Sequence, residues 1–283
     1  MSIAWFPGHM VTARKDVQEE MRKTDVVIEV LDARVPYSSC NPDLERLRSE
    51  NQRPALKLLN ISDLADPEWT KAWLLYYNAR PLVRAIALSA KRRNEVNRVV
   101  AECVSLAPSR TGTKPLRLMI LGIPNVGKST IMNTLLNRHV ANVGDEPAIT
   151  KMQMRHQIAP NIWLVDTPGL LWPGMSQDVA LKLAATHSIG RNAYDDSSVA
   201  VELGQYLLKR YPARIIARFG AIPPGTDGFS LLERIAERRS FVGKGGSPDL
   251  NKAASILLQE FRTGVLGRIT LETVEEVAQR RLK

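Results

Sequence analysis

The sequence predicts an α/β fold with a mainly parallel sheet, followed by a smaller all-helical region. Short aliphatic runs alternate with longer amphipathic stretches through roughly the first 170 residues. These runs are apolar on both faces, as in strands that helices cover on two sides. Such runs stop after about Pro173. We therefore expect a first domain over residues 1–173 and a helical domain over residues 174–283.

The expected strands are aliphatic runs that turn residues bound, at 25–31, 55–60, 82–89, 116–122 and 162–166. The expected helices of the first domain have amphipathic spacing and lie at 42–50, 67–78, 94–107 and 128–137. The first two open with a proline, which suits a first helical turn. In the second domain we expect helices at 177–186, 197–210, 229–239, 250–263 and 271–281.

The composition excludes several classes of protein. The 283 residues are 44% hydrophobic and 24% charged, as in ordinary globular chains. No apolar run approaches the ~18 residues that a membrane span needs. The first residues show neither a secretory signal nor a transit peptide, so we expect a cytosolic protein. Cys40 and Cys103 are too few for a disulfide framework or a cysteine zinc site, and we expect both to be small buried residues without a chemical role.

The net charge indicates an anionic partner. The chain has 39 Lys and Arg against 29 Asp and Glu, a balance of +10, and nucleic acid is the commonest partner of such a chain. After residue 170 there are 16 basic and 12 acidic residues, so the excess is shared by both domains. The helical domain could be a plain packing partner, but its charge favours an RNA-binding surface.

The strongest motif is the run Gly122-Ile123-Pro124-Asn125-Val126-Gly127-Lys128-Ser129, which follows an apolar strand and opens a helix. This context is typical of a phosphate-binding loop. Its glycines let the backbone N–H groups approach the phosphates, and Lys128 can reach the β and γ oxygens. The Ser129 hydroxyl can ligate Mg²⁺.

A second motif, Asp166-Thr167-Pro168-Gly169, ends the last expected strand. Asp166 can hold Mg²⁺ directly or through water, and the Gly169 N–H can meet a γ-phosphate and sense its loss. Alone, these four residues are a common turn. Together with the phosphate loop they indicate a P-loop nucleotidase.

Two further loops at strand ends suit recognition of a guanine base. Asp63, in Asn60-Ile61-Ser62-Asp63, is an acceptor that can take the N1–H and the 2-amino group of guanine. The Ala90 N–H, in Ser89-Ala90-Lys91, could donate to guanine O6. Each loop alone is more typical of a turn or a helix cap. Their occurrence at successive strand ends favours the base site.

The order of these motifs, base loops first and phosphate loop after, resembles the circularly permuted GTPases of ribosome assembly. The chain shares further landmarks with that family: Trp5-Phe6-Pro7-Gly8-His9-Met10, Asp32-Ala33-Arg34-Val35-Pro36, Ser38-Ser39, Asn41-Pro42, Thr130 and Trp172-Pro173. The resemblance is close over the first domain and loose over the helical one. It implies a circularly permuted P-loop GTPase domain, which is permissible because the termini of a compact domain often lie close together.

The resemblance also implies a function and a site. The family binds GTP and GDP, docks on an immature large ribosomal subunit and its rRNA, and hydrolyses GTP when assembly permits release. It implies nucleotide contacts by Asn60, Ile61, Ser62, Asp63, Ser89, Ala90, Lys91, Asn125, Val126, Gly127, Lys128, Ser129, Thr130 and Gly169. It places Mg²⁺ at Ser129, Thr150 and Asp166, with K⁺ at Asn125, and assigns catalysis to Lys128 and His9. We expect a monomer.

The chain differs from Ras-like enzymes at one catalytic position and departs from the family at two. Leu170 stands where Ras-like enzymes carry a water-orienting Gln, and His9 matches the family's proposed substitute. Ile61 replaces the Lys of the usual guanine motif, Asn-Lys-x-Asp. In Pro147-Ala148-Ile149-Thr150, the segment that matches the family's switch sequence Pro-Gly-Ile-Thr, Ala148 replaces the Gly. His9 could also be a packed residue without a chemical task. Two alternatives stay open: a nucleotide-dependent docking protein with negligible hydrolysis, and a GTPase that acts on another RNA such as tRNA.

Overall fold

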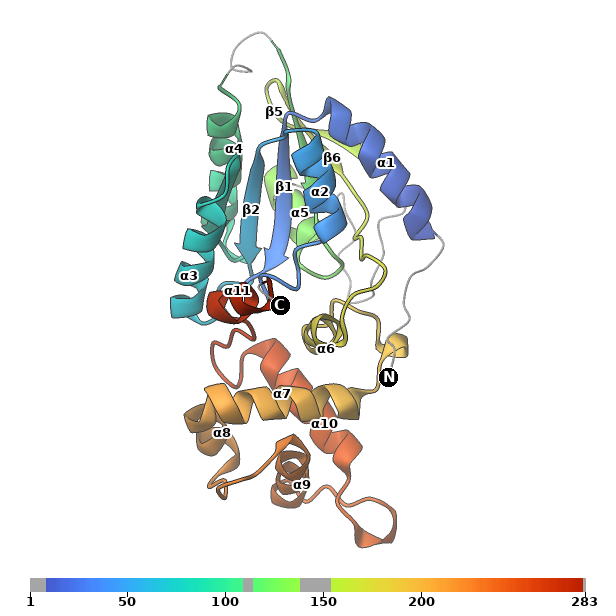
Figure 1. Cartoon of the computed structure of the whole chain (residues 1–283), viewed down its shortest axis with the longest axis vertical. Coiled ribbons are helices and arrows are strands. Elements are labelled where there is room, and N and C mark those ends of the chain that lie inside the picture. Colours follow the sequence, from blue (N-terminus) through green and yellow to red (C-terminus); the bar gives the residue numbers. More distant parts are fainter. Residues whose placement is uncertain (1–8, 109–113, 138–153, 282–283) are drawn as a thin grey trace. The chain divides into compact units, whose positions relative to one another are not determined.

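The structure, a computed structural model, describes residues 9–108, 114–137 and 154–281 (Figure 1). The described chain forms two compact units. The sheet unit contains the residues up to Gly174 and those from Glu272 onward, and the helical unit is Met175–Leu271. Among the described residues, no helix is long and apolar enough to cross a membrane.

The sheet unit is built on one six-stranded sheet in the order β3-β2-β1-β4-β6-β5. All neighbouring strands are parallel except β5 and β6, which are antiparallel. This confirms the α/β class and the mainly parallel sheet. The strands are β1 (Val26–Asp32), β2 (Ala55–Asn60), β3 (Val83–Ala87), β4 (Leu116–Leu121), β5 (Met154–Ala159) and β6 (Ile162–Asp166).

The central strands β1 and β2 are buried over their whole length, which explains why most of their residues are apolar; their polar residues Glu29, Asp32, Lys57 and Asn60 are buried as well. The strand that the sequence analysis missed is β5, an edge strand in which exposed Arg155 and Gln157 flank the buried His156. An edge strand with one solvated face has too few apolar residues to stand out in a sequence.

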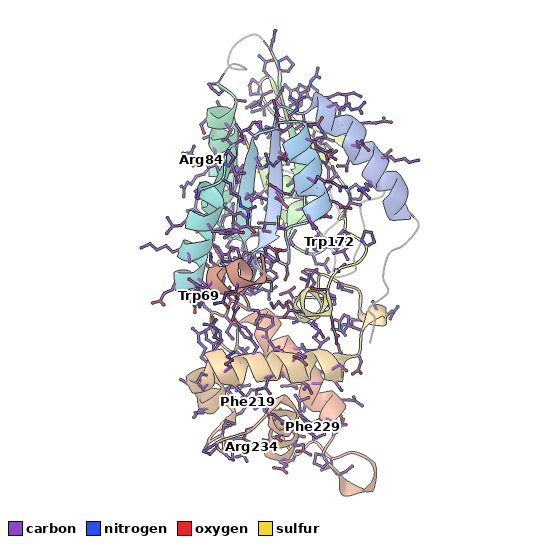
Figure 2. The ribbon with its side chains drawn as sticks, viewed as in Figure 1. Trp69, Arg84, Trp172, Phe219, Phe229 and Arg234 are labelled. Atoms are coloured by element: carbon purple, nitrogen blue, oxygen red, sulfur yellow. The ribbon has the colours of Figure 1, made fainter. Side chains whose placement is uncertain are left out.

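The helices of the sheet unit are α1 (His9–Lys23), α2 (Pro42–Glu50), α3 (Pro67–Asn78), α4 (Arg93–Leu106), α5 (Lys128–Leu136) and α11 (Val274–Arg281). Figure 1 shows α1 beside α2, and the two helices are in contact. On the other side of β1 and β2, α4 contacts both strands and α5. Arg84 of β3 reaches α4, where it pairs with Glu102 at 3.0 Å (Figure 2).

The helical unit contains α6 (Gln177–Ala185), α7 (Asp196–Arg210), α8 (Pro212–Phe219), α9 (Gly228–Arg238) and α10 (Leu250–Thr263). Helix α7 contacts each of the other four. It lies so close to α9 that a Cβ on Gly228 would be 2.0 Å from the Val201 carbonyl oxygen. Figure 2 labels Phe219, which is buried, and Phe229, which is 49% exposed. The sequence analysis missed α8 because only Tyr211 separates it from α7.

The C-terminal residues differ from the expected division of the chain. We expected a helix at 271–281 in the helical domain, but from Glu272 onward the chain groups with the sheet unit, where α11 contacts α3. Glu272 accepts the Tyr37 N–H at 2.8 Å, and its carbonyl oxygen accepts from the Trp73 indole at 3.1 Å. A local pattern identifies an amphipathic helix but does not say which unit covers its apolar face.

Candidate nucleotide-binding site

The phosphate loop connects β4 to α5 at the carboxyl edge of the sheet, where ligands bind in open parallel sheets. Three of its residues have positive φ: Gly122 at 150°, Asn125 at 59° and Gly127 at 93°. A Cβ on Gly122 would be 2.6 Å from the Val30 carbonyl oxygen, so only glycine fits there. Gly127 is followed directly by α5, whose first N–H groups and helix dipole suit an anion.

Two oppositely charged residues are buried beside the phosphate loop: Lys128 at the start of α5 and Asp166 at the end of β6. Each is less than a tenth exposed. The Lys128 Nζ donates to the Ile123 carbonyl oxygen at 2.7 Å. Burial lowers the pKa of Lys128 to about 8, against the attraction of Asp166. Burial also raises the pKa of Asp166 to about 6, against the effect of Lys128. Both groups are therefore poised to bind a charged ligand, because each charged form is poorly solvated without one.

The residues at the end of β6 and the start of α5 fit a magnesium ion. Ser129 is half-buried in the first turn of α5, and Asp166 is the last residue of β6. A hydroxyl and a carboxylate are hard oxygen donors of the kind that Mg²⁺ takes beside nucleotide phosphates. The third residue that we expected at the ion, Thr150, lies outside the described residues.

The segment after Asp166 is held against the phosphate loop. The Thr167 hydroxyl donates to the Ile120 carbonyl oxygen at 2.7 Å. A Cβ on Gly169 would be 2.9 Å from the backbone of Pro124, so the two segments approach as closely as glycine allows. The Leu170 N–H donates to the Gly122 carbonyl oxygen at 3.2 Å. The γ-phosphate sensor that we expected at Gly169 therefore adjoins the loop.

Leu170 is buried, and its carbonyl oxygen accepts from the Asn41 side chain at 2.9 Å. The Asn41 Oδ1 accepts the Asp43 N–H at 3.0 Å and caps α2. The sequence analysis counted Asn41 only as a landmark of the family. The signal it offered was that of a helix cap before a proline, which does not reveal a contact 129 residues away.

Asn60, the last residue of β2, joins the phosphate loop to the base loops. Its Nδ2 donates to the Val126 carbonyl oxygen at 2.7 Å, and its Oδ1 accepts the Ala90 N–H at 2.8 Å. The Asn60 side chain is buried between them. The structure thus gives the Ala90 N–H a partner within the chain, where we expected guanine O6. The Asn60 amide lies so close to Gly127 that any side chain at that glycine would displace it.

The remaining base-loop residues lie together at the ends of β2 and β3. The Ser62 N–H donates to the Leu88 carbonyl oxygen at 3.2 Å, which ties the first loop to the second. The Ser89 N–H donates to Glu95 at 2.7 Å. The Asp63 side chain is about one-fifth exposed, and the Lys91 Nζ lies 3.7 Å from its carboxylate. An exposed pair at this distance contributes little to stability, which leaves Asp63 able to accept from a base.

Ile61 has a backbone conformation that β-branched residues rarely adopt. Its φ is 62°, in the left-handed region, which costs an L-residue roughly 1–2 kcal/mol. The Leu64 N–H donates to the Ile61 carbonyl oxygen at 3.0 Å, so the turn is closed by its own hydrogen bond. Compared with the family's Lys, Ile61 therefore lacks the ammonium group and also puts a β-branched side chain in a strained backbone conformation.

Of the two residues that we expected in catalysis, only Lys128 has a described side chain. His9 is the first residue of α1, and our expectation for its imidazole lies outside the described side chains. The other nucleotide residues are brought together. Val126 and Gly127 face Asn60, while Asn125, Ser129 and Thr130 are half-buried along the loop and the first turn of α5.

A buried charged cluster lies apart from the loop. The Lys57 Nζ donates to Glu29, to Glu45 at 2.9 Å and to the Cys40 sulfur at 3.5 Å. Burial raises the pKa of the Cys40 thiol to about 12. The two carboxylates and the thiol could ligate a metal by their spacing, but the Lys57 ammonium occupies the place of a cation. Cys40 therefore belongs to a polar network, whereas Cys103 is a buried residue of α4 as expected.

Comparison with known proteins agrees with this geometry. A family model described as 50S ribosome-binding GTPase matches residues 117–201, which include the phosphate loop and Asp166. Ribosome biogenesis GTPase A of Bacillus cereus is 36% identical over 288 residues, covering 99% of this chain and 96% of that protein. The chain belongs to the ribosome biogenesis GTPase A family.

Other relatives of the family agree in fold and length. Mitochondrial ribosome-associated GTPase 1 of the mouse is 30% identical and is covered to 89% of its length. The GDP-bound structure of YlqF from Thermotoga maritima superposes with a TM-score of 0.66 and 26% identity, over 92% of this chain and 99% of that one. The fold is therefore that of a circularly permuted GTPase. The chain is a GTP hydrolase that binds guanine nucleotide with Mg²⁺ and has a role in ribosome assembly.

Proposed function

We propose that this GTPase binds an immature large ribosomal subunit through its rRNA, hydrolyses GTP late in assembly and then leaves the particle. The observation that carries the proposal is the pair of hydrogen bonds by which Asn60 joins Val126 to Ala90. A single nucleotide that contacts both the phosphate loop and the base loops can shift their conformation together, because Asn60 connects them. Release from a particle requires such a coupled change. We propose that it acts on these particles as a monomer. Because the particles assemble in the cytosol, we place the protein there.

The chain's own residues would divide the chemistry as follows. Lys128 leaves the Ile123 carbonyl oxygen to meet the phosphates, whose charge favours the ammonium form. Ser129 and Asp166 would hold Mg²⁺, which when bound would neutralise negative charge on the phosphates. Asp63 reads the base, and Gly169 meets the γ-phosphate. Leu170 has no group that could orient water, so another residue must do so.

For that task we propose His9. It begins α1, and it stands in the N-terminal motif that resembles the family's. A positioned general base or water-orienting group contributes typically 10²–10⁴-fold to the rate. Because His9 is far from the phosphate motifs in sequence, its segment can approach the γ-phosphate only when the fold or the particle places it there. Basal turnover is then slow and rises with the particle.

For Asn125 we propose a potassium ion beside the phosphates. Its amide oxygen is a hard donor on a half-buried turn residue. A cation there would stabilise developing negative charge, as an arginine finger does in other GTPases. Asn125→Gly tests this directly, because glycine accepts the φ of 59° and removes only the side chain. The preference of turnover for K⁺ over Na⁺ should disappear in this variant.

For the rRNA contact we propose the helical unit. Some of its arginines are committed to structure: Arg218 and Arg239 both pair with the buried Glu260. Other basic residues of the unit are exposed, among them Lys209 and Arg238. If these meet phosphates, binding to the particle should weaken steeply with salt. Reversing two of them, Lys209→Glu with Arg238→Glu, should weaken co-sedimentation while GDP affinity stays unchanged.

Turnover with and without purified large subunits tests the function. We expect stimulation by immature particles, and His9→Ala should lower the saturated kcat by roughly 10²-fold with GTP affinity little changed. His9→Gln is the control, because Gln can orient water and should retain more activity. If His9→Ala has a normal kcat at saturating particle concentration, His9 has no catalytic role.

The buried Leu170 also favours a second candidate, a docking protein with negligible hydrolysis. Such a protein would bind particles while GTP is bound to it and would release them only when the nucleotide is exchanged. Saturating particles would then leave kcat at its basal value. Stimulation by tRNA instead of large subunits would indicate another RNA target.

A further inference from the structure

A groove of about 510 Å³ lies on the sheet unit, away from the residues of the nucleotide site. The end of α1, the start of β4 and the hairpin of β5 and β6 line it. Its lining includes Lys23, Arg117, Arg155 and Trp163. None of these residues takes part in the chemistry described above.

The strand register places the strand residues of the groove on one face of the sheet. Arg117 of β4 is the partner of Trp163 in β6, and Arg155 of β5 is the partner of Val165. Partners across neighbouring strands share a face, and so do residues two apart on one strand. Arg117 therefore lies directly across from Trp163, and Arg155 lies diagonally from it on the same face, because the direct partner of Trp163 in β5 is Gln157.

This face is accessible to solvent. Trp163 is 38% exposed, and the Arg155 side chain is 60% exposed. Parallel sheets normally have helices on both faces, so an exposed tryptophan in β6 marks a part of the sheet that helices leave open. A large exposed aromatic residue with a polar rim is a feature of binding surfaces.

The charge of the groove is positive and only partly compensated. The one carboxylate among its described lining residues, Glu20, is nearly buried and accepts from Arg155 at 2.9 Å. The nearby Asp25 accepts the Arg117 backbone N–H at 2.9 Å. Both carboxylates thus have assigned hydrogen bonds, while Lys23 and Arg117 add two exposed cations to the rim.

An aromatic ring among cations is the arrangement that binds single-stranded nucleic acid. Bases stack on aromatic side chains, and Lys and Arg track the phosphates. Charge complementarity excludes a basic partner, and the flat indole on a sheet favours an unpaired base over a duplex, whose bases are stacked internally. We propose that this groove, which we call the Trp163 groove, binds a single-stranded RNA segment with one base on the Trp163 indole. The proposal rests on the proposed function only for the identity of that RNA as rRNA.

Fluorescence anisotropy of the full chain with a labelled single-stranded oligouridine tests the groove. Trp163→Leu should weaken binding roughly 10-fold, within the range that a lost base–aromatic stack costs. Trp163→Phe keeps a ring and should stay within about threefold of wild type. Arg117→Glu should weaken binding and lower the salt slope by about one unit.

The matched control is Arg98→Glu, the same charge reversal at an exposed residue of α4. It should leave oligouridine affinity near that of wild type. Equal losses in Arg98→Glu and Arg117→Glu, or unchanged affinity in Trp163→Leu, would overturn the proposal. So would tighter binding of an oligoglutamate peptide than of the RNA, because an acidic protein would then be the better occupant.

The outcome separates this proposal from the proposed function. If wild type fails to bind oligouridine but still co-sediments with large subunits and is stimulated by them, the groove proposal is wrong and the function stands. If oligouridine binding depends on Trp163 while particles leave turnover unchanged, the groove stands and the function fails.

Discussion

The phosphate side and the proposed base side of the nucleotide site differ in the groups that form them, which are mainly backbone on the first and side chains on the second. The phosphate side is a backbone turn whose glycines touch neighbouring backbone and side-chain atoms, closed over a buried lysine and aspartate. The proposed base side includes the side chains of Asp63 and Lys91, which are partly or largely exposed. A site made of backbone contacts tolerates few substitutions, whereas one made of exposed side chains can change gradually. The departure at Ile61 falls on the tolerant side.

The largest effect should come from Gly127→Ala. A methyl group there would be 2.3 Å from the Asn60 Nδ2, so the Asn60 side chain that joins Val126 to Ala90 must move. We expect GTP and GDP affinity to fall by about 100-fold or more, equivalent to about 3 kcal/mol. Isothermal titration of both nucleotides measures it.

Gly174→Ala is the control for that variant. Gly174 has a similarly positive φ of 70° but nothing within 4 Å of its Cβ. Alanine pays the same backbone cost at both sites, roughly 1–2 kcal/mol in the free energy of unfolding. Nucleotide affinity should fall only in Gly127→Ala, and equal losses in both variants would mean that backbone strain rather than the Asn60 contact is responsible.

An effect of comparable size on affinity should come from Asp63→Asn on the base side. Loss of the acceptor for N1–H and the 2-amino group should weaken GTP binding by about 2–4 kcal/mol and improve the relative binding of XTP, whose 2-oxo group needs a donor. Lys91→Ala removes the ion pair but keeps the carboxylate, so it should have a much smaller effect. A GTP to XTP affinity ratio that Asp63→Asn leaves unchanged would remove Asp63 from the base site.

Helices with strong local signals could be predicted to the residue. Asn41 and Asp66 each cap a helix that begins with a proline, and the observed bounds of α2 and α3 are those that the sequence predicts. Elements without such signals were missed, namely α1, β5 and α8: β5 has one buried face, and α8 follows α7 after a single residue. Their positions depend on the tertiary contacts around them.

The motifs of the site could be read from the sequence, but the bonds that join them could not. The residue types of the phosphate loop define its chemistry wherever the loop lies. The two hydrogen bonds of Asn60, and that of Asn41 to Leu170, connect loops that are distant in sequence, so only the folded chain shows them. The same is true of the Trp163 groove, because strand order and register place its cations together.

The phosphate side should also show a pH dependence when nucleotide is absent. Burial raises the pKa of Asp166 from 3.8 to about 6, so between these values the folded chain binds a proton that the unfolded chain has lost. Wild-type stability should therefore fall, relative to Asp166→Asn, as the pH rises from about 4 to about 6. We expect the difference to reach about 3 kcal/mol by pH 7, measured by urea unfolding. Adding Mg²⁺ and GTP should make the wild-type protein more stable than Asp166→Asn, because the carboxylate then has a cation to bind. A constant difference across this pH range would contradict the assignment.

The smallest effect should come from Ile61, where the tolerant side can be improved. Its φ of 62° is costly for a β-branched side chain, and replacing it with an unbranched residue should raise the free energy of unfolding by about 1 kcal/mol. Ile61→Leu tests this term alone. Ile61→Lys relieves the same strain and adds the ammonium of the family's motif, which supports the base and the phosphate loop rather than the γ-phosphate. We therefore expect both variants to be stabilised equally in thermal unfolding without nucleotide, and only Ile61→Lys to bind GDP and GTP more tightly, by a similar factor for each. Tightening confined to GTP would place the lysine at the γ-phosphate, and tightening in Ile61→Leu as well would mean that loop strain alone limits affinity.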